Sequence, residues 1–582
     1  MMETKKIRKQ QFGLVALSLI MFVVTIDTTI TNIALPTITD YFKTNLTDSN
    51  WVSTVYVLIL SVLMIPAAKL ADQLGRKKIM LIGLSIFGIG SLMCALSSSL
   101  SFLISMRFLQ GVGGAIAMPV EIPLAVDLLG RAKANKSVGI IGAVAAIAAA
   151  SGPVIGGLLI HLWSWHAIFY INVPIVLITI VLIAVCFGES FDESVSKRID
   201  LIGIILLSIA LFFLTFVLLK GYDYGWLSKK ILLMLFGSIL STCLFVITER
   251  KKAEPLIEYK LFKDPTFFSS TVIYFLCGFT IVCSSVVFNF FLENIKNYSP
   301  LHAAYIIMFT SIMTMIAMPI GSQLGQKLNY CWVIVFGVFL TSISLLLLTQ
   351  LSMDMSVFTM AFDMCVLGLG FGLSSLALIS AVQYIPEEKA GIASGMVNAG
   401  RQLGTCLGIA LLVGLLNNNI DYSFQQTQSY SIKVIEKSNI SDPLKQISKR
   451  QVKKLFVLSN YNNALEKQKL LIAKSRIKYV FLRKKSIPKP QKGSGLRKLY
   501  KANQQLIIES KKSGKNNTFI VEQQSLSQVI SLIGEKQELQ KIFKQTKQEE
   551  NRQIIKAFKK TYLCAFVLIT VCIPVSFFTD KK

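Results

Sequence analysis

Two opposite charges lie inside apolar sequence in the first part of the chain, Asp27 and Arg107. Asp27 lies about fifteen residues into the first apolar run, which is about 22 Å of helix. Arg107 lies about six residues, or roughly 9 Å, into a run that crosses in the opposite direction. Both side chains are therefore expected at one depth, in the outer half of a hydrocarbon core about 30 Å thick. Ionisable residues at that depth are costly and are functional hypotheses by default.

An acid and a guanidinium at one depth are suited to proton transfer. Burial favours the protonated form of a carboxyl group, whereas a neighbouring Arg favours the ionised form. If Arg107 moved in and out of contact, Asp27 would release and take up a proton. The alternative interpretation is a permanent structural ion pair.

Three more ionisable residues fall inside apolar runs: Glu121, Asp363 and Arg401. Glu121 lies between Pro119 and Pro123, and it could bind a proton or a cationic substrate, or simply face a cytoplasmic vestibule. Asp363 is a second candidate acid. Arg401 lies near mid-membrane and needs an acceptor, for which Asp363 is a candidate.

The elements that must position these residues are membrane-spanning helices. The chain is 53% hydrophobic and only 16% charged, which is far from a soluble domain. Spans must be helical because their backbone groups have to bond internally. Apolar runs long enough to span a bilayer predict fourteen helices, at about 13–35, 51–71, 79–98, 101–125, 138–161, 167–187, 201–220, 230–248, 267–291, 302–324, 331–350, 356–380, 391–416 and 561–578.

Lys and Arg in the short loops set the orientation. Basic clusters precede the first span and follow the second, fourth and eighth, so they fall on one side if the spans alternate. The opposite loops, such as 97–101 and 350–356, carry little positive charge. The positive-inside rule therefore predicts that both termini are cytoplasmic.

One long basic segment interrupts this pattern. Residues 418–560 contain 31 Lys and Arg and 10 Asp and Glu, a net charge of +21 out of +28 for the chain. The alternation places this loop outside, which is permitted because long loops translocate largely regardless of charge. We expect two helix-prone halves joined by a hinge at 486–495, contacting anionic lipid or an extracytoplasmic partner, or else a largely solvated insertion. An outside location argues against nucleic-acid binding.

A Gly- and Ala-rich run at 142–159 contains Gly152, Pro153, Gly156 and Gly157. Small residues let another helix come backbone-close, and the Pro bends the helix. The predicted role is either a static contact or an outer seal that limits leak during movement. A similar Gly-rich run recurs eight spans later, at 391–408. Two six-span halves separated by two extra spans would explain this repeat, which is typical of transporters.

With these residues in hand, the chain resembles the fourteen-helix drug:proton antiporters of the major facilitator superfamily. The matching segments cover about 1–416 plus the last span, and they are 26–36, 51–58, 70–78, 107–114, 151–157, 169–174 and 398–404. The resemblance implies that Arg107 takes part in proton coupling and that Gly152, Pro153, Gly156 and Gly157 form the antiporter motif. The turn with Asp72, Gly75, Arg76 and Lys77 would gate the cytoplasmic side.

The chain also departs from the family pattern. Ala68 stands where the turn motif usually begins with Gly, and Trp163-Ser-Trp165 replaces the usual Trp-Arg-Trp. The second-half turn at 321–328 has lost the acid and most of the basic residues. None of these departures removes the coupling pair.

The sequence thus predicts an all-α polytopic membrane protein with the major facilitator fold. Its expected parts are a six-helix half at 1–190, two linker helices at 191–255, and a second half at 256–582 that carries the loop 418–560. The predicted function is proton-coupled efflux of small amphipathic or cationic compounds such as drugs. The alternatives are export of a metabolite, siderophore or lipid, and a scaffold that displays the basic loop.

The expected location is the bacterial cytoplasmic (inner) membrane. The expected partners are a small-molecule substrate, protons and membrane lipid. No catalytic triad, metal cluster or phosphate-cradling loop is apparent in the sequence, so we expect no enzyme activity, no cofactor and no metal site.

Overall fold

The computed structural model describes residues 2–44, 46–191, 200–252, 261–385, 390–455, 489–492, 494–513 and 517–580. Within these residues every regular element is a helix. Thirteen of them are long and apolar enough to cross a membrane. The remaining predicted span, 138–161, lies inside a further continuous helix, Arg131–Leu162. The all-helical prediction is confirmed.

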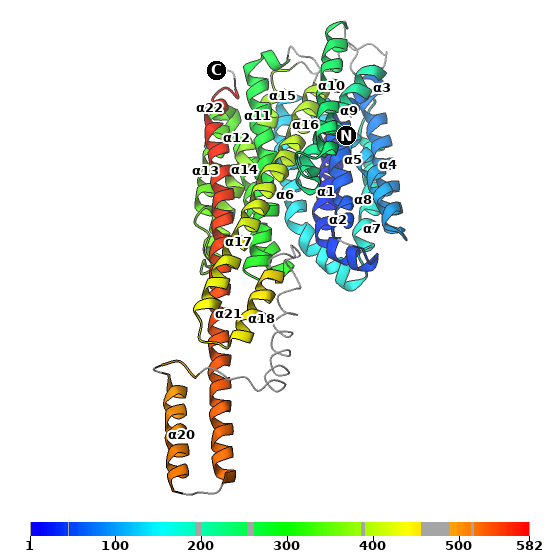
Figure 1. The fold of residues 1–582 in the computed structure, drawn as a ribbon. Coiled ribbons are helices and arrows are strands. Elements are labelled where there is room, and N and C mark those ends of the chain that lie inside the picture. The colour runs from blue at the N-terminus through cyan, green and yellow to red at the C-terminus, as the bar shows by residue number, and fades with distance from the viewer. Residues whose placement is uncertain are drawn as a thin grey trace. The chain divides into compact units, whose positions relative to one another are not determined.

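The first six predicted spans form one group of helices (Figure 1). Their bounds are α1 (Met2–Tyr41), α3 (Trp51–Leu74), α4 (Arg76–Ala95), α5 (Leu100–Leu129), α6 (Arg131–Leu162) and α8 (Asn172–Cys186), with the single turns α2 (Leu46–Ser49) and α7 (Ala167–Tyr170). The helices α3 and α5 end at Gly75 and Gly130, whose φ values of 110° and 74° suit glycine. In this group α6 packs on α1, and α3 and α4 pack on α5.

Two linker helices follow, α9 (Leu201–Tyr224) and α10 (Lys229–Arg250), and they pack on each other. Lys252 Nζ donates to Asp200 Oδ2 at 2.5 Å and to Glu249 Oε1 at 2.9 Å, which joins the two ends of this hairpin. Burial raises the pKa of Asp200, but the hydrogen bonds and charge around it, led by that of Lys252, lower the pKa to below its ordinary value.

The helix α9 also packs on α3 of the first group. Here Lys220 Nζ lies 5.0 Å from the centre of the Trp51 ring, and the Trp51 and Phe216 rings are 5.8 Å apart. A cation over an aromatic face is attracted by the ring quadrupole. The linker hairpin is thus anchored on the helix that opens with Trp51.

The second group repeats the first. Its elements are η1 (Leu261–Lys263), α11 (Pro265–Val282), η2 (Cys283–Phe288), η3 (Phe291–Ile295), α12 (Pro300–Leu328), α13 (Tyr330–Leu348), α14 (Val357–Ser374), α15 (Ala377–Val382), α16 (Ala390–Gly408), η5 (Ile409–Val413) and α22 (Ile573–Ser576). The helix α16 packs on α11 as α6 packs on α1, and the two groups meet through α6 with α12 and through α3 with α16.

The chain forms two compact units, residues 1–415 with 559–582, and residues 416–558. The second unit is built from α17 (Gly414–Lys437), α18 (Asp442–Leu455), α20 (Gly495–Lys512) and most of α21 (Asn517–Val571). Ile435, Ile440, Leu444 and Ile542 form a small core in it. The hinge predicted at 486–495 lies partly outside the described residues.

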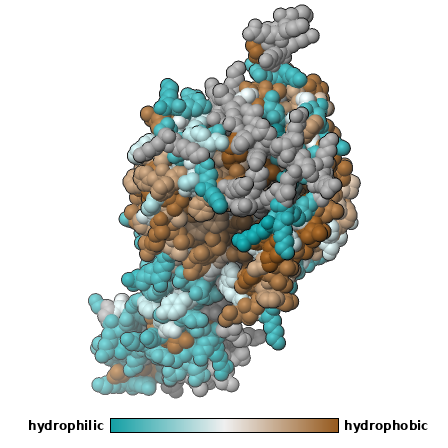
Figure 2. Space-filling model, turned by 90° about the horizontal axis from the view of Figure 1, so that it is seen from above, coloured by the Kyte–Doolittle hydropathy of each residue, from teal (hydrophilic) through white to brown (hydrophobic). Residues whose placement is uncertain are grey.

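The flanks of the first unit are apolar, as a lipid-facing surface requires. Leu233 on α10 is 71% exposed and Val185 on α8 is 72% exposed. Figure 2 shows broad hydrophobic areas on the visible part of the molecule. None of the ten cysteines forms a disulfide in the described part of the chain. No group of His, Cys, Asp or Glu able to hold a metal ion occurs in the described ranges.

Candidate functional site

Asp27 on α1 and Arg107 on α5 are in direct contact. Arg107 Nη1 donates to Asp27 Oδ2 at 2.5 Å. Arg107 is 0% exposed and Asp27 is 1% exposed. Arg107 Nε donates to the carbonyl oxygen of Val52 at 2.9 Å, and its Cζ lies 4.3 Å from the centre of the Tyr56 ring. The guanidinium is therefore held by a carboxylate, a carbonyl and an aromatic face.

Two amides complete the shell of Asp27. Gln110 Nε2 and Asn172 Nδ2 both donate to Asp27 Oδ1 at 2.9 Å. Both also donate to the hydroxyl of Ser91, at 2.6 and 3.1 Å, and Gln110 Oε1 accepts from Arg107 Nη1 at 2.6 Å. The carboxylate thus accepts hydrogen bonds from three protein donors.

Sequence reasoning missed Gln110 and Asn172. Gln110 follows Arg107 by three residues, so both lie on one face of α5. Asn172 opens α8. Both residues stand inside the segments 107–114 and 169–174 that carry the family resemblance, so buried amides in those motifs were the available signal.

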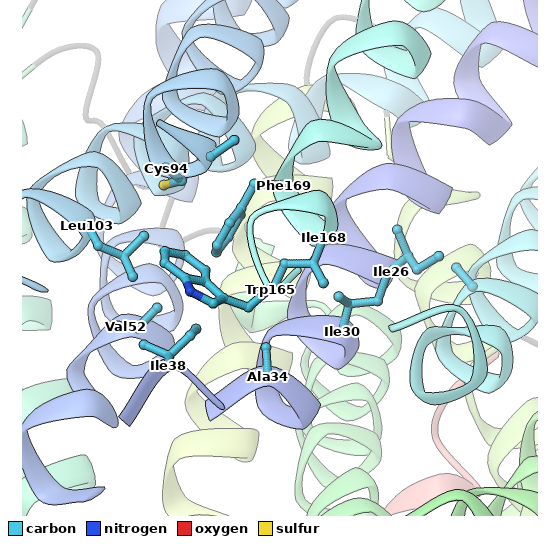
Figure 3. Packing of buried hydrophobic residues seen from close by; sticks show 12 residues of the cluster. Ile26, Ile30, Ala34, Ile38, Val52, Cys94, Leu103, Trp165, Ile168 and Phe169 are labelled. Carbon is cyan, nitrogen blue, oxygen red and sulfur yellow. The ribbon is translucent and has the colours of Figure 1, made fainter. Parts of the chain in front are cut away.

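A packed apolar cluster covers the ion pair on one side. Trp165 lies at its centre in Figure 3, with Phe169 and Leu103 beside it. Further members include Ile30, Ala34, Ile38 and Val52. The Phe169 ring centre is 5.5 Å from Arg107 Cζ, so the cluster reaches the guanidinium itself. This side of the pair is closed to water.

The predicted cytoplasmic turn forms a compact charge network. Arg76 Nε donates to Asp72 Oδ1 at 2.8 Å, and Arg76 Nη1 donates to Asp127 Oδ1 at 3.2 Å. Lys77 Nζ donates to the carbonyl oxygen of Ala184 at 2.7 Å.

An acid beyond the turn caps the start of α4. Glu189 Oε1 accepts from the Lys77 amide at 3.0 Å and Glu189 Oε2 from the Lys78 amide at 3.2 Å. A carboxylate is stabilised at a helix N-terminus by the unpaired amides and the helix dipole. A Cβ at Gly75 would lie 2.6 Å from Glu189 Oε1 and would displace this carboxylate, and the φ of 110° is the main reason for glycine here.

The second-half turn is built in the same way with an acid from another segment. Asn329, at φ 72°, takes the place of Gly75, and the next amide, Tyr330 N–H, donates to Asp580 Oδ2 at 2.8 Å. Gln383 and Tyr384 also donate to Asp580 Oδ1, at 2.9 and 2.6 Å. Burial, with the hydrogen bond and charge of Asp580, raises the pKa of Tyr384 to about 12. Asp580 is therefore the counterpart of Glu189: each carboxylate accepts from an amide at the start of the helix that follows the turn.

Two glycines of the predicted antiporter motif, Gly152 and Gly156, face α1. A Cβ at Gly152 would overlap Thr29 Oγ1, and a Cβ at Gly156 would lie 3.4–3.6 Å from Ile30. Gly157 has open space around it, and Pro153 lies within the continuous α6. The close contact of Gly152 and Gly156 is thus made inside the first group of helices.

The three remaining candidates do not form one site. Glu121 is 2% exposed and Asp363 is 1% exposed, and Glu121 Oε1 and Asp363 Oδ2 have no hydrogen-bond partner in the described part of the chain. Arg401 does not pair with Asp363 among these residues: its Cζ lies 5.8 Å from the centre of the Tyr274 ring on α11.

Comparison with known proteins identifies the family. Residues 17–409 match the Major Facilitator Superfamily. The chain is 30% identical over 411 residues to the multidrug resistance protein Stp of Mycobacterium tuberculosis, covering 70% of this chain and 76% of that protein. It is also 30% identical over 421 residues to the riboflavin transporter RibZ of Clostridioides difficile, covering 72% and 91%.

A solved structure supports the same fold. The crystal structure of the human organic anion transporter MFSD10 (TETRAN) matches with a TM-score of 0.52 at 12% identity, covering 70% of this chain and 93% of that one. Relatives named for drug resistance or export recur, including the tetracenomycin C resistance and export protein of Streptomyces glaucescens, at 30% identity over 70% of this chain and 76% of that protein. The chain is thus a multi-pass membrane transporter of a small-molecule substrate, and it is not an enzyme. It belongs to the drug-efflux family of the major facilitator superfamily.

Proposed function

We propose that the chain is a proton-coupled antiporter that exports small amphipathic or cationic compounds, such as drugs, by alternating access. The observation that carries this proposal is the buried pair of Asp27 and Arg107, with its two amide donors and no solvent exposure above 1%. A carboxylate inside the membrane that one proton can neutralise is able to couple proton movement to a change of conformation.

The proposed cycle starts when a proton from outside neutralises Asp27. The neutral acid no longer holds the charge of Arg107, which remains tied to Val52 and lies over Tyr56. Freeing the guanidinium favours rocking of the two helix groups, and the substrate then enters from the cytoplasm or inner leaflet. Return of Arg107 to Asp27 releases the proton inside. The reverse rocking movement then carries the substrate outside, where it leaves.

The other predicted residues have proposed places in this cycle. Glu121 and Asp363 are candidate acids for a substrate or a second proton, because both are buried with an oxygen atom that lacks a partner among the described residues. The network of Asp72, Arg76 and Asp127 is the proposed cytoplasmic latch. For Arg401 we propose a substrate contact over Tyr274, in place of pairing with Asp363.

The proposed setting is a bacterial inner membrane with both termini in the cytoplasm. The positive-inside pattern supports this orientation of the termini. The bacterial origin of the relatives supports a location in a bacterial membrane. Residues 416–558, in which α18 carries Lys445, Lys449, Arg450 and Lys453, would then lie outside, where contact with anionic lipid or a partner is proposed.

The decisive experiment is Asp27→Asn assayed in inverted vesicles with an imposed pH gradient. We expect normal insertion, no proton-driven accumulation of a cationic dye, and retained downhill exchange. Asp40→Asn is the matched control, because Asp40 is an exposed carboxylate on the same helix. Normal gradient-driven transport by the Asp27 variant would refute the mechanism.

A second candidate function is export of an endogenous metabolite, siderophore or lipid. This second function is supported by the similarity to a riboflavin transporter, which covers 91% of that protein. A panel of cationic dyes, flavins and lipids in proteoliposomes with a pH gradient separates the two. Gradient-driven movement of a flavin but not of the dyes would select the metabolite function.

A further inference from the structure

One polar atom beside the coupling pair has no hydrogen-bond partner. Asn172 is 0% exposed, and its side-chain oxygen Oδ1 has no partner among the described residues. The nitrogen of the same amide is fully engaged, because Asn172 Nδ2 donates to Asp27 Oδ1 at 2.9 Å and to Ser91 Oγ at 3.1 Å. A buried carbonyl oxygen without a partner costs free energy, and in a native protein it calls for an explanation.

The orientation of this amide follows from the charge of Asp27. An ionised carboxylate only accepts hydrogen bonds, so the NH2 end of Asn172 must be the end that faces Asp27 Oδ1. The carbonyl end then points to a place where the described part of the chain offers it no donor. A proton on Asp27 Oδ1 would reverse this preference, because the O–H of a neutral acid needs an acceptor.

Gln110 is the second amide at Asp27, and its carbonyl end is occupied. Gln110 Nε2 donates to Asp27 Oδ1 at 2.9 Å, and Gln110 Oε1 accepts from Arg107 Nη1 at 2.6 Å. Turning this amide would place its NH2 against the guanidinium, so that two donors would meet. Of the two amides, only that of Asn172 can turn without breaking a hydrogen bond of its carbonyl oxygen.

Ser91 can bond to either end of the Asn172 amide. Its hydroxyl accepts from Gln110 Nε2 at 2.6 Å and from Asn172 Nδ2 at 3.1 Å, and a hydroxyl has one O–H to donate as well. After a turn of the amide, that O–H donates to Asn172 Oδ1 and the bond from Gln110 stays. Asn172 Nδ2 then takes the place of Oδ1 as the atom without a partner, so a turn leaves one unpaired atom in the amide, as before.

The charged and titratable groups that act on Asp27 among the described residues are Arg107 from α5, Cys94 from α4 and Tyr56 from α3. The helix α6 meets α1 near this level through Gly152. The helix α8 contains no Asp, Glu, Lys, Arg or His. A proton on Asp27 therefore acts on Arg107 through charge and on the two amides through hydrogen bonds.

We propose that the Asn172 amide is a positioning group that detects the proton on Asp27. This inference rests on the proposed function and adds one step to it. A proton from outside forms an O–H bond at Asp27 Oδ1, and the Asn172 amide turns so that its Oδ1 accepts from this O–H. The neutral acid is then bonded to α8 through its own proton, and Arg107 on α5 has lost the charge of its partner. When Asp27 releases the proton, the amide turns back.

An amide that only fastens α8 to α1 would behave differently. It would present its NH2 end to Asp27 in both protonation states, and its carbonyl oxygen would stay without a partner throughout. The two roles therefore differ in what the acid O–H donates to, which infrared spectra of the carbonyl groups report directly.

The first test is infrared difference spectroscopy of the purified chain in lipid, between alkaline and acid pH. The band of the protonated Asp27 carboxyl is the one that Asp27→Asn removes. We expect Asn172→Leu, which has nearly the shape of Asn without its polar atoms, to move this band to higher frequency, because the acid O–H has lost its acceptor. Gln110→Leu is the comparator, because it removes a donor to the same oxygen and keeps that acceptor. Equal shifts in both variants, or no shift in Asn172→Leu, overturn the proposal.

A second measurement uses the wild-type chain and needs no substitution at Asn172. Asn is labelled isotopically at its side-chain carbonyl carbon, and the same difference spectrum is recorded. On acidification we expect one labelled carbonyl band to move to lower frequency, because the free Oδ1 gains hydrogen bonds from Asp27 and Ser91. Asp27→Asn should abolish this change. Labelled bands that do not move on acidification overturn the proposal.

Transport separates this inference from the function on which it rests. In vesicles with an imposed pH gradient, Asn172→Leu should lower kcat for a cationic dye about tenfold, with KM and downhill exchange unchanged. An unchanged kcat, or an Asp27 band that appears in acid but does not respond to Asn172→Leu, overturns the role of Asn172 alone. Absence of the Asp27 band at every pH overturns the proton-coupled function and this step with it.

Discussion

Replacing one partner of the buried ion pair should lower the unfolding free energy by more than replacing both partners together. Arg107 is 0% exposed and Asp27 is 1% exposed, so Arg107→Gln leaves a carboxylate that water cannot solvate. Removing one partner of a buried pair typically costs about 3–5 kcal/mol of unfolding free energy. In Asp27→Asn with Arg107→Gln, no buried charge remains, and Gln110 and Asn172 can still bond to the new amide.

The unfolding free energies of wild type, the two single variants and the double variant form a cycle. We expect the double variant to lose at least about 2 kcal/mol less than the sum of the single losses. The assay is denaturation in mixed micelles, followed by fluorescence of the five Trp residues. Asp40→Asn combined with Arg107→Gln is the control and should be additive. Additivity of the Asp27 cycle within about 0.5 kcal/mol would refute the reasoning.

The glycine face, the second turn and the linker hairpin can each be tested with a simple substitution. Gly152→Ala should lower stability by about 1–3 kcal/mol because its Cβ meets α1, whereas Gly157→Ala has free space and should be neutral or stabilising; equal losses would contradict this. Asp580→Asn should speed hydrogen exchange of the first amides of α13 and leave α4 unchanged, and Glu189→Gln should do the reverse. Asp200→Asn should lower the unfolding midpoint at pH 7. The pKa of Asp200 is depressed in the folded chain, so its contribution to stability is present above about pH 4 and is lost as the pH falls through the depressed value. If wild type and Asp200→Asn still differed in unfolding midpoint in acid, the stabilising role of the Asp200–Lys252 contact would be contradicted.

The helices and the main ion pair could be predicted because they depend on local composition and on depth. Apolar runs place the spans, and counting residues from each end brings Asp27 and Arg107 to one level. Depth does not determine the direction of a side chain, and this is why the pairing of Arg401 with Asp363 was not found in the structure. Arg401 lies over the ring of Tyr274 instead.

Contacts between distant segments were beyond sequence reasoning. The sequence around 321–328 gives no indication that the Tyr330 amide donates a hydrogen bond to Asp580. Likewise, the composition of the Gly-rich run at 142–159 did not distinguish a static helix contact from an outer seal. The structure shows instead which helix Gly152 and Gly156 contact, namely α1.

The two capped turns differ in when they can form during synthesis. Glu189 follows the Lys77 amide by 112 residues, so the first turn can be completed while later helices are still being made. The Tyr330 amide must wait for Asp580, 250 residues later, and the whole basic segment is made in between. At about 5–20 residues per second, that interval is roughly 12–50 s. During that time the start of α13 lacks its cap, and the second half of the protein is open to the chaperones and proteases of the cell.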